Sequence, residues 1–382
     1  MAGTAPWAVV FGGPSPEHEI SILTGLQAER VLAAAGHDVV AIYWSPTGDW
    51  YRVPAGTEAK DYLEGAPRDS TPLEARVSGD PGLYRRKTFG AERLDIESAL
   101  LCLHGGVGEG GGAAAVFSLL GIPATGSTLF AGAVGMDKLA FGGLMSAAGI
   151  PSLPREAVST LTEPAFDGPY IVKPRFGGSS IGIEIAEDVA AARALAVSSV
   201  HLRTGAVVEP YRPELVDLNI AFRTFPELEI TQLEKPLRGE AGSALYSYAE
   251  KYLAGGAGAD AGLTSAPREF PAEVPDAVHA RARELAERVA DVTRLTGIVR
   301  VDLLLDEASG ELYVNEVNTI PGALSLYLWA PQQPAATVLV DALTEARDRR
   351  VVFPQAGFGG GAALRAAGGI AGKLVGLDGP RA

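Results

Sequence analysis

Two neighbouring stretches near residue 300 carry polar side chains that could hold a metal ion. IVRVDLLL places Arg300 and Asp302 in an otherwise apolar run, and ELYVNEVN, after the turn DEASG, adds Glu316 and Asn318. Side chains alternate along a strand, so each pair shares a face, and a hairpin would bring Asp302, Glu316 and Asn318 together. Two carboxylates and an amide oxygen suit Mg²⁺ that also binds substrate phosphates. The alternative is a solvated strand face that merely carries charges.

A glycine-rich loop, RFGGSSIG, follows the apolar segment YIVKP. Gly178 and its neighbouring glycines let the backbone approach phosphate oxygens, and Ser179 and Ser180 add hydroxyl and N–H donors. The loop matches neither the Walker nor the Rossmann pattern, so a plain flexible turn explains it equally well. Lys173 before the loop, and Lys138 in a predicted helix, are singly no more than surface lysines. The two lysines become candidates for a site only together with the glycine-rich loop and the acidic cluster.

Alternating strands and helices must position these groups, which predicts an α/β fold with α+β parts. The N-terminal strand–helix–strand order, from Trp7 to Trp44, predicts a parallel sheet. We expect a helix over about residues 130–148, and another from Val278 to Val292, where apolar residues recur at helical spacing. Asp276 is its predicted N-cap and Gly297 its stop.

The pattern divides the chain into four predicted parts. They are an N-terminal substrate domain, a small central subdomain, a C-terminal subdomain with the metal and catalytic residues, and a Gly/Ala-rich tail that is poorly ordered or loosely helical. They span residues 1–129, 130–212, 213–350 and 351–382.

Composition excludes several functions. The 382 residues carry a net charge of −14 and the sequence pI is about 4.9, which disfavours nucleic-acid binding because phosphate neutralisation needs a basic surface. The single cysteine, Cys102, cannot form an internal disulfide and is expected to be a buried strand residue. We see no secretory signal and no uninterrupted membrane helix, so we expect a cytoplasmic protein without a membrane partner.

The motifs occur together in a known family. The chain resembles the D-alanine–D-alanine ligases of the ATP-grasp superfamily from about Trp7 to about Ala346. The resemblance implies an ATP-grasp fold with an N-terminal parallel-sheet domain, and a reaction through an acyl phosphate that a second molecule's amine attacks. It is carried, in the family's order, by FGGPSPEHEIS, LHGGVGE, GIPATGS, MDK, VKPRFGGSSIG, YSYAEKY, RVDLLLD and VNEVNTIPG.

The resemblance also implies catalytic roles. Glu17 matches the carboxylate that holds the first substrate's ammonium, and Ser179 and Tyr252 match its partners in a hydrogen-bonded triad. Arg300 and the backbone N–H of Gly322 match the groups that stabilise the oxyanion.

Further matches concern the ligands. His104 matches a histidine of the first-substrate site, and Asp302, Glu316 and Asn318 match ligands of magnesium, with two ions expected and Mn²⁺ acceptable. The lysines match contacts to ATP phosphates, Glu209 matches the adenine-hinge acid, and Asp217 is nearest to a ribose-binding acid. The implied ATP site comprises Lys138, Lys173, Gly178, Ser180, Glu209, Tyr211, Asp217 and Lys251.

The chain departs from the family most clearly after Gly322, where it reads ALSLYLWAP. Tyr327 stands where the family has a serine that holds the second substrate's carboxylate, although Leu328 is retained. The larger ring could occlude the acceptor pocket or reshape it for another amine, and Ser325 could supply a substitute hydroxyl. Three smaller departures are the run GGGAA after HGGVGE, Phe-Gly in the glycine loop, and a shifted acid in YSYAEKY.

Three hypotheses about function follow. The first is a D-alanine–D-alanine ligase, or a close D-amino-acid ligase with an altered acceptor site, acting in peptidoglycan synthesis. The second is a specialised ATP-grasp ligase of secondary metabolism that joins an amino acid to another amine or hydroxy acid. The third is an inactive nucleotide-binding protein, which the intact catalytic set disfavours. The expected partners are small amino acids and, by resemblance, a second copy in a homodimer.

Overall fold

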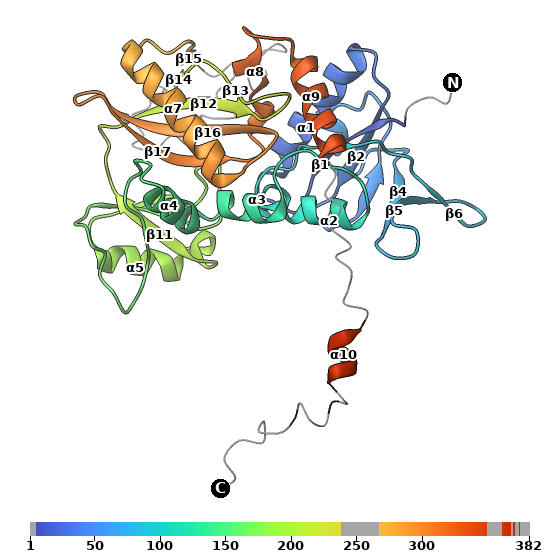
Figure 1. Cartoon of the computed structure of the whole chain (residues 1–382), viewed down its shortest axis with the longest axis horizontal. Coiled ribbons are helices and arrows are strands. Elements are labelled where there is room, and N and C mark those ends of the chain that lie inside the picture. Colours follow the sequence, from blue (N-terminus) through green and yellow to red (C-terminus); the bar gives the residue numbers. More distant parts are fainter. Residues whose placement is uncertain (1–4, 238–266, 350–360, 368–369, 371–373, 375–382) are drawn as a thin grey trace. The chain divides into compact units, whose positions relative to one another are not determined.

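The computed structural model describes residues 5–237, 267–349, 361–367, 370 and 374. The chain separates into two units, Met1–Arg349 and Arg350–Ala382. Within the predicted tail, the described residues include a short helix, α10 (Ala362–Ala366). The first unit contains the other described helices and strands (Figure 1).

The N-terminal sheet is mixed. Its strand order is β6-β5-β4-β3-β2-β1-β7, and β1 pairs in parallel with both β2 and β7 around helix α1, which confirms the predicted parallel core. The other four strands extend it through antiparallel pairs that the sequence analysis did not anticipate. The elements are β1 (Trp7–Gly12), α1 (His18–Ala34), β2 (Val39–Trp44), β3 (Trp50–Arg52), η1 (Ala59–Tyr62), β4 (Thr71–Arg76), β5 (Gly82–Arg86), β6 (Ala91–Arg93) and β7 (Ala99–Leu101).

The predicted helix over residues 130–148 is two helices, α3 (Leu129–Met136) and α4 (Lys138–Ala147). Asp137 breaks it with a ψ of 99°, and its Oδ1 accepts hydrogen bonds from the first backbone N–H groups of α4. An aspartate in this position caps the second helix rather than continuing the first. Before α3 lie the turn η2 (Gly108–Gly112) and α2 (Ala113–Leu119). Gly111 has a φ of 90°, and a Cβ there would lie 2.7 Å from Leu129 Cα.

The central sheet is small and antiparallel, in the order β10-β9-β11-β8. Strand β9 ends at Pro174, directly before the glycine-rich loop, and β10 begins after it. The loop is therefore held between two paired strands, with α5 beneath them (Figure 1). The elements are β8 (Glu156–Ala157), β9 (Tyr170–Pro174), β10 (Glu184–Ala186), α5 (Val189–Ser198), η3 (Val200–Leu202) and β11 (Ala206–Pro210).

The C-terminal sheet, in the order β13-β12-β16-β17, carries the predicted hairpin. Helix α7 (Asp276–Thr293) packs its apolar stripe on one face, which leaves the other face for polar side chains. The helix begins at Asp276, but Pro275 is its N-cap, and it ends at Thr293 through the left-handed Arg294 rather than at Gly297. The strands are β12 (Val216–Arg223), β13 (Glu229–Ile230), β16 (Ile298–Asp306) and β17 (Glu311–Asn318), with β14 (Lys235–Pro236) and β15 (Arg268–Glu269) in a two-stranded sheet alongside.

After β17 the chain returns to the N-terminal sheet. The turn η4 (Gly322–Ser325), α8 (Leu326–Trp329) and α9 (Ala335–Asp348) follow, and Trp329 and Leu343 join the N-terminal core. Each Å² of apolar surface that is buried contributes about 25 cal/mol to stability, so this packing holds η4 firmly against the N-terminal core. Cys102, directly after β7, is buried as predicted.

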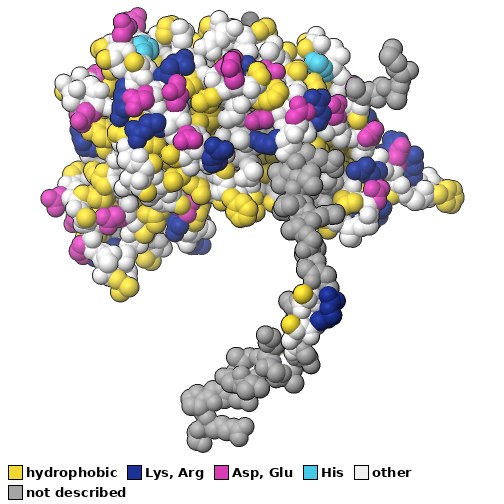
Figure 2. Space-filling view, viewed as in Figure 1, with side chains coloured by type: hydrophobic (Ala, Val, Ile, Leu, Met, Phe, Trp, Pro, Cys, Tyr) yellow, Lys and Arg dark blue, Asp and Glu magenta, His cyan; other side chains and the backbone are white. Residues whose placement is uncertain are grey.

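Acidic and basic side chains are interspersed over the face shown in Figure 2, without a large field of one sign. Among the described residues, no helix is both long and apolar enough to cross a membrane.

Candidate active site

A pocket of about 250 Å³ lies between the polar face of the C-terminal sheet, the glycine-rich loop and the start of α1. Ser325 and Leu328 are not among its lining residues, and Tyr252 and Lys251 lie outside the described residues. The predicted site residues that line it are Glu17, His104, Lys138, Lys173, Gly178, Ser179, Ser180, Glu209, Tyr211, Asp217, Arg300, Asp302, Glu316, Asn318, Gly322 and Tyr327.

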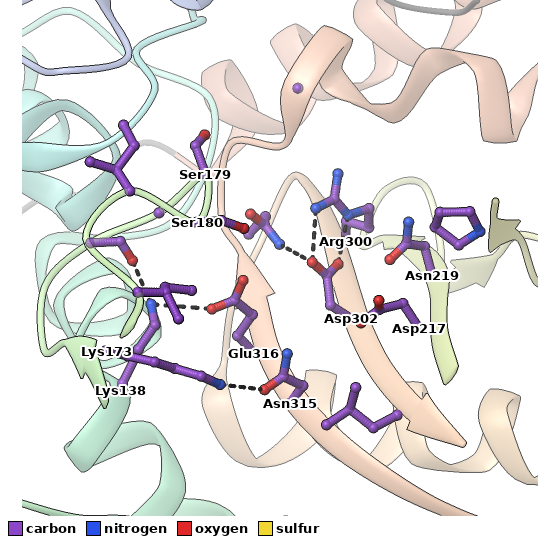
Figure 3. Close-up of a pocket in the computed structure, with 18 of the residues that line it drawn as sticks. Lys138, Lys173, Ser179, Ser180, Asp217, Asn219, Arg300, Asp302, Asn315 and Glu316 are labelled. Carbon is purple, nitrogen blue, oxygen red and sulfur yellow. Dashed lines mark hydrogen bonds and ion pairs between the residues drawn. The ribbon is translucent and has the colours of Figure 1, made fainter. Parts of the chain in front are cut away.

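The hairpin of β16 and β17 has the register that brings the predicted metal-binding side chains together. Arg300 pairs with Asn318 and Asp302 with Glu316, and Asn318 Nδ2 donates to Asp302 Oδ2 at 3.1 Å. Arg300 donates to both oxygens of Asp302, at 2.6 and 2.8 Å (Figure 3). Such a two-pronged contact fixes the guanidinium plane, so Arg300 is held rigidly beside the carboxylates.

The pairing of β16 and β17 shifts between Asp302 and Leu303. This β-bulge adds one residue, Asn315, to β17, which simple alternation does not predict. Asn315 and Glu316 are consecutive, yet both lie toward the pocket, while Val314 and Val317 are buried in the core. Bulges often re-aim a side chain in this way beside functional sites. Nothing in the sequence announces the bulge, so Asn315 was not predicted.

The start of α4 delivers Lys138 to the acidic cluster. Asp137 caps the helix and accepts two hydrogen bonds from Arg175, at 2.8 and 2.6 Å, while Lys138 N donates to the Arg175 carbonyl at 3.0 Å. Lys138 Nζ then lies 3.1 Å from Glu316 Oε2 and donates to the Gly177 carbonyl. The ammonium group therefore bridges the glycine-rich loop and β17.

Lys173 lies in a buried group of charges. Its Nζ donates to Glu209 Oε2 at 2.8 Å and to Asn315 Oδ1 at 3.3 Å, and Arg155 Nε lies 3.3 Å from Glu209 Oε1 as an ion pair without hydrogen-bond geometry. Burial acts to raise the pKa of Glu209, but Lys173, Arg155 and Lys138 outweigh it and hold that pKa below its usual range. Glu209 is therefore ionised, and two cations share it.

The glycine-rich loop meets the start of α1 at the other end of the pocket. Ser179 Oγ donates to a carboxylate oxygen of Glu17, which is 7% exposed. Ser179 and Ser180 have left-handed φ values of 52° and 58°, a strained backbone that aims their N–H groups differently from a strand. A Cβ at Gly105 would collide with the Glu17 carboxylate, so a glycine is required there.

His104 links three segments around the pocket. Its Nδ1 lies 2.7 Å from the Ile320 carbonyl, which can only accept, so Nδ1 carries the proton and Nε2 accepts from Thr24 Oγ1 at 2.8 Å. Thr24 Oγ1 in turn accepts from Ala323 N at 3.2 Å. Burial lowers the pKa of His104 to about 4, so the ring is neutral. Both ring nitrogens are bonded to protein groups, which anchors the turn before Gly322.

Glu109 lies in the motif LHGGVGE but is not among the predicted site residues. Its carboxylate accepts from Gly105 N at 2.9 Å and Ile320 N at 3.2 Å. Burial, reinforced by the nearby charge of Glu17, raises the pKa of Glu109 to about 7. It ties the loop after His104 to the turn before Gly322.

The remaining end of the pocket contains residues that the sequence analysis missed, around Tyr327. Tyr327 Oη donates to Glu234 Oε2 at 3.2 Å, and the Arg268 guanidinium lies over the Tyr327 ring, 4.2 Å from its centroid. Ser325 is fully buried and its hydroxyl has no hydrogen-bond partner among the described residues. It is therefore not a substitute for a serine facing the pocket.

The chemistry of this pocket is defined by cations facing hard oxygen ligands. Within the described residues, no three His, Cys, Asp or Glu side chains form a self-contained metal site. Asp302, Glu316 and Asn318 instead offer the small oxygen set that suits Mg²⁺ when phosphate oxygens complete its shell. The pocket therefore brings lysine ammonium groups and oxygen ligands together on one face of the C-terminal sheet.

Comparison with known proteins identifies the family to which the chain belongs. The family model for the D-ala D-ala ligase N-terminus matches residues 7–127, and that for the C-terminus matches residues 132–343. A D-alanine–D-alanine ligase of Kineococcus radiotolerans is 34% identical over 361 residues, covering 85% of this chain and 91% of the relative. One of Mycolicibacterium vanbaalenii is 32% identical over 348 residues, with the same coverage. The chain belongs to the D-alanine–D-alanine ligase family of ATP-dependent peptide ligases.

Solved structures share the ATP-grasp fold. The VanG D-Ala:D-Ser ligase of Enterococcus faecalis superposes with a TM-score of 0.73 at 24% identity, covering 90% of this chain and all of the other. The D-alanyl-alanine synthetase A of Vibrio cholerae gives 0.73 at 21% identity, with 91% and 100% coverage. The predicted fold class is confirmed.

Proposed function

We propose that this chain uses ATP to convert an amino-acid carboxylate into an acyl phosphate, which the amine of a second amino acid attacks. The observation that carries the proposal is a single pocket with two different groups of side chains at opposite ends. Lys138 and Lys173 face Glu316 and Asn315 on one side, and the Glu17–Ser179 pair lies at the other. A peptide ligase needs both a phosphate site and a site for an amino-acid ammonium, close to each other.

Asp302, Glu316 and Asn318 would hold Mg²⁺, because they are adjacent oxygen donors on one sheet face. Two ions are proposed, and Mn²⁺ would serve in their place. When bound, the metal neutralises the charge that develops on the phosphates. Lys138 already lies 3.1 Å from Glu316, so lysine and metal would share this carboxylate.

The nucleotide would lie between the central and C-terminal sheets. Lys138, Lys173, Gly178 and Ser180 would contact its phosphates, and the buried Glu209 would lie at the adenine. The other residues assigned to the nucleotide are Tyr211, Asp217 and Lys251, the last outside the described residues.

This chain's own groups supply the rest of the reaction. The Glu17 carboxylate would hold the first substrate's ammonium, oriented by Ser179 and completed by Tyr252. The fixed guanidinium of Arg300 and the backbone N–H of Gly322 would stabilise the oxyanion formed when the amine attacks. His104 and Glu109 would keep the turn that carries Gly322 in place through their hydrogen bonds.

The names of the relatives favour D-alanine as the first substrate. Membership of the family supports a role in peptidoglycan synthesis. A cytoplasmic location and a homodimer are further parts of the proposal. We assign the sheets to the predicted N-terminal domain and two ATP-grasp subdomains, residues 1–129, 130–212 and 213–350. A second candidate is a specialised ligase with another acceptor, because Tyr327 lines the pocket where a serine is expected.

The test is an ADP-release screen of the full chain with ATP and Mg²⁺ over D- and L-amino acids, singly and in pairs, with product masses measured. We expect D-alanine to support turnover, either alone or with a second amine. A Glu17→Gln variant should need a roughly 10–100-fold higher concentration of the first substrate for turnover, yet still bind ATP. ATP binding without ADP release for any amino acid would identify an inactive nucleotide-binding protein and overturn the proposal.

A further inference from the structure

We propose that Arg268 binds the carboxylate of the second, acceptor substrate, and that Glu234 and Tyr327 position it. This inference rests on the proposed function, because it names the residue that would recognise the acceptor. None of the three belongs to the metal, nucleotide or first-substrate sets. They line the part of the pocket formed by β15, the segment before β14, and α8.

Within the part of the chain that the structure describes, two contacts hold the Arg268 guanidinium in place. Its Nη1 lies 3.1 Å from Glu234 Oε1, and its Cζ lies 4.2 Å from the centroid of the Tyr327 ring. The Arg268 side chain is 16% exposed and lines the pocket. An arginine that stacks on a ring and pairs with one carboxylate keeps a planar fork in a set orientation, which suits recognition of a second carboxylate.

Glu234 is committed to protein groups. One oxygen pairs with Arg268, and the other accepts from Asn219 Nδ2 at 3.0 Å and Tyr327 Oη at 3.2 Å. Burial, with the nearby Glu234 charge, raises the pKa of Tyr327 above its usual range, so its hydroxyl stays a donor. An acid engaged on both oxygens is a poor site for the acceptor's amine, whereas the positively charged guanidinium beside it attracts an anion.

The sheet places this cluster on the side of Asp302 that is away from the lysines. Glu234 bridges to Asn219, Asn219 pairs with Asp302, and Asp302 pairs with Glu316, so the four side chains form one row across the sheet. Neighbouring strands lie ~4.8 Å apart, which puts Glu234 about 10 Å from Asp302. An amino acid lying from Arg300 to Arg268 would point its amine toward the reacting centre and its carboxylate away from it.

Tyr327 stands where the family has the serine that binds the acceptor's carboxylate, so another group must bind that carboxylate. Its ring also limits the size of the acceptor. The family's serine is absent here, and the hydroxyl of Ser325 is buried outside the pocket lining. The Tyr327 ring occupies pocket space and supports Arg268 from below. The acceptor class is therefore an α-amino acid with a free carboxylate and a small side chain.

The test uses D-alanine together with D-alaninamide, which lacks the carboxylate and can serve only as an acceptor. Full-length protein, ATP, Mg²⁺ and equal amounts of the two compounds yield D-alanyl-D-alanine and D-alanyl-D-alaninamide, which differ in mass. Their ratio cancels the donor step and the amount of folded enzyme. We expect the wild type to favour the dipeptide, and Arg268→Gln to lower the ratio ~10-fold or more, as loss of a charged hydrogen bond implies.

Matched variants separate recognition from folding. Arg288→Gln removes an arginine of α7 that donates to the Ala148 and Gly149 carbonyls outside the pocket, and should keep the wild-type ratio. Glu234→Gln should lower the ratio less than Arg268→Gln, because it loosens the guanidinium without removing it. An unchanged ratio in Arg268→Gln overturns the role of Arg268, and an unchanged ratio in Glu234→Gln overturns the positioning role.

Absence of both products with the wild type would count against the proposed function with D-alanine, and calorimetry would then decide the inference. D-alanine and D-alaninamide are titrated separately into the ADP-bound protein. A preference for D-alanine that Arg268→Gln reduces, and that Arg288→Gln does not, supports the carboxylate site. Equal binding of the two compounds, or a preference that Arg268→Gln leaves unchanged, overturns it.

Discussion

The two ends of the pocket differ in how they are built. At the donor and phosphate end, Glu17, Lys138 and Glu316 belong to short motifs that the family shares, and their contacts join these motifs to one another and to the glycine-rich loop. At the acceptor end, Arg268, Glu234 and Tyr327 come from three separate segments and no common motif. If the proposed roles hold, the activation step depends on residues within the family's motifs, whereas acceptor choice depends on residues that the fold brings together from outside them.

The largest effect should come from Arg300, which lies between the two ends. Arg300→Lys keeps the charge but loses the paired contact with Asp302 and the fork that faces the oxyanion. We expect kcat for ADP release to fall ~10²–10³-fold, as for loss of one oxyanion donor, without a comparable loss of thermal stability. Arg281→Lys, in an exposed pair on α7, is the control. A kcat within threefold of the wild type would remove Arg300 from the reaction.

Glu17→Gln should affect the donor end alone. The amide keeps the size of the side chain but loses the charge that would attract an ammonium, so the KM of the first substrate should rise roughly 10–100-fold. The ratio of dipeptide to dipeptide amide should stay at its wild-type value, because that ratio reports only the acceptor. A change in the ratio equal to that of Arg268→Gln would show that the two ends are not separate.

Tyr327→Ser should alter acceptor size selection. The variant removes the ring and should raise the use of D-norvaline relative to D-alanine as acceptor by ~10-fold, a typical effect of pocket volume. Tyr327→Phe keeps the ring, loses only the bond to Glu234, and should retain the wild-type size preference. Product masses from mixed acceptors measure both. If the two variants behave alike, the ring volume is not what limits the acceptor.

The sequence predicted what depends on local periodicity. Alternation along β16 placed Arg300 and Asp302 on one face, and helical spacing located α7. It failed where one residue changes the geometry, because the bulge that brings Asn315 to the pocket and the break at Asp137 leave no periodic signal. Short antiparallel strands such as β3 are too brief for a pattern to distinguish them from loops.

The site residues also fall into those that sequence motifs identify and those that only tertiary contacts reveal. Residues within motifs could be assigned by resemblance, and the pocket contains nearly all of those that the structure describes. Arg268 could not, because its importance comes from a ring and a carboxylate that the fold brings to it from distant positions. Glu109 was visible in its motif, but its link to Ile320 is a tertiary contact.

The smallest predicted effect is a pH dependence at the donor end, where Glu109 and His104 oppose each other. The folded pKa of Glu109, about 7, lies above its ordinary value, so between about pH 4.5 and 7 the folded state binds the extra proton and stability falls as pH rises. The folded pKa of His104, about 4, lies below its ordinary value, so between about pH 4 and 6.5 the unfolded state binds the extra proton and stability rises with pH.

The two slopes, each at most ~1.4 kcal/mol per pH unit, largely cancel in the wild type. Glu109→Gln should therefore show stability that rises from pH 4.5 to 6.5, and His104→Gln stability that falls over the same range. Denaturant unfolding at several pH values measures both. Both groups bond to Ile320 in the turn before Gly322. Parallel pH profiles in the two variants would therefore mean that at least one of the two groups does not titrate as its burial implies, and that the donor end is more open to water than the fold indicates.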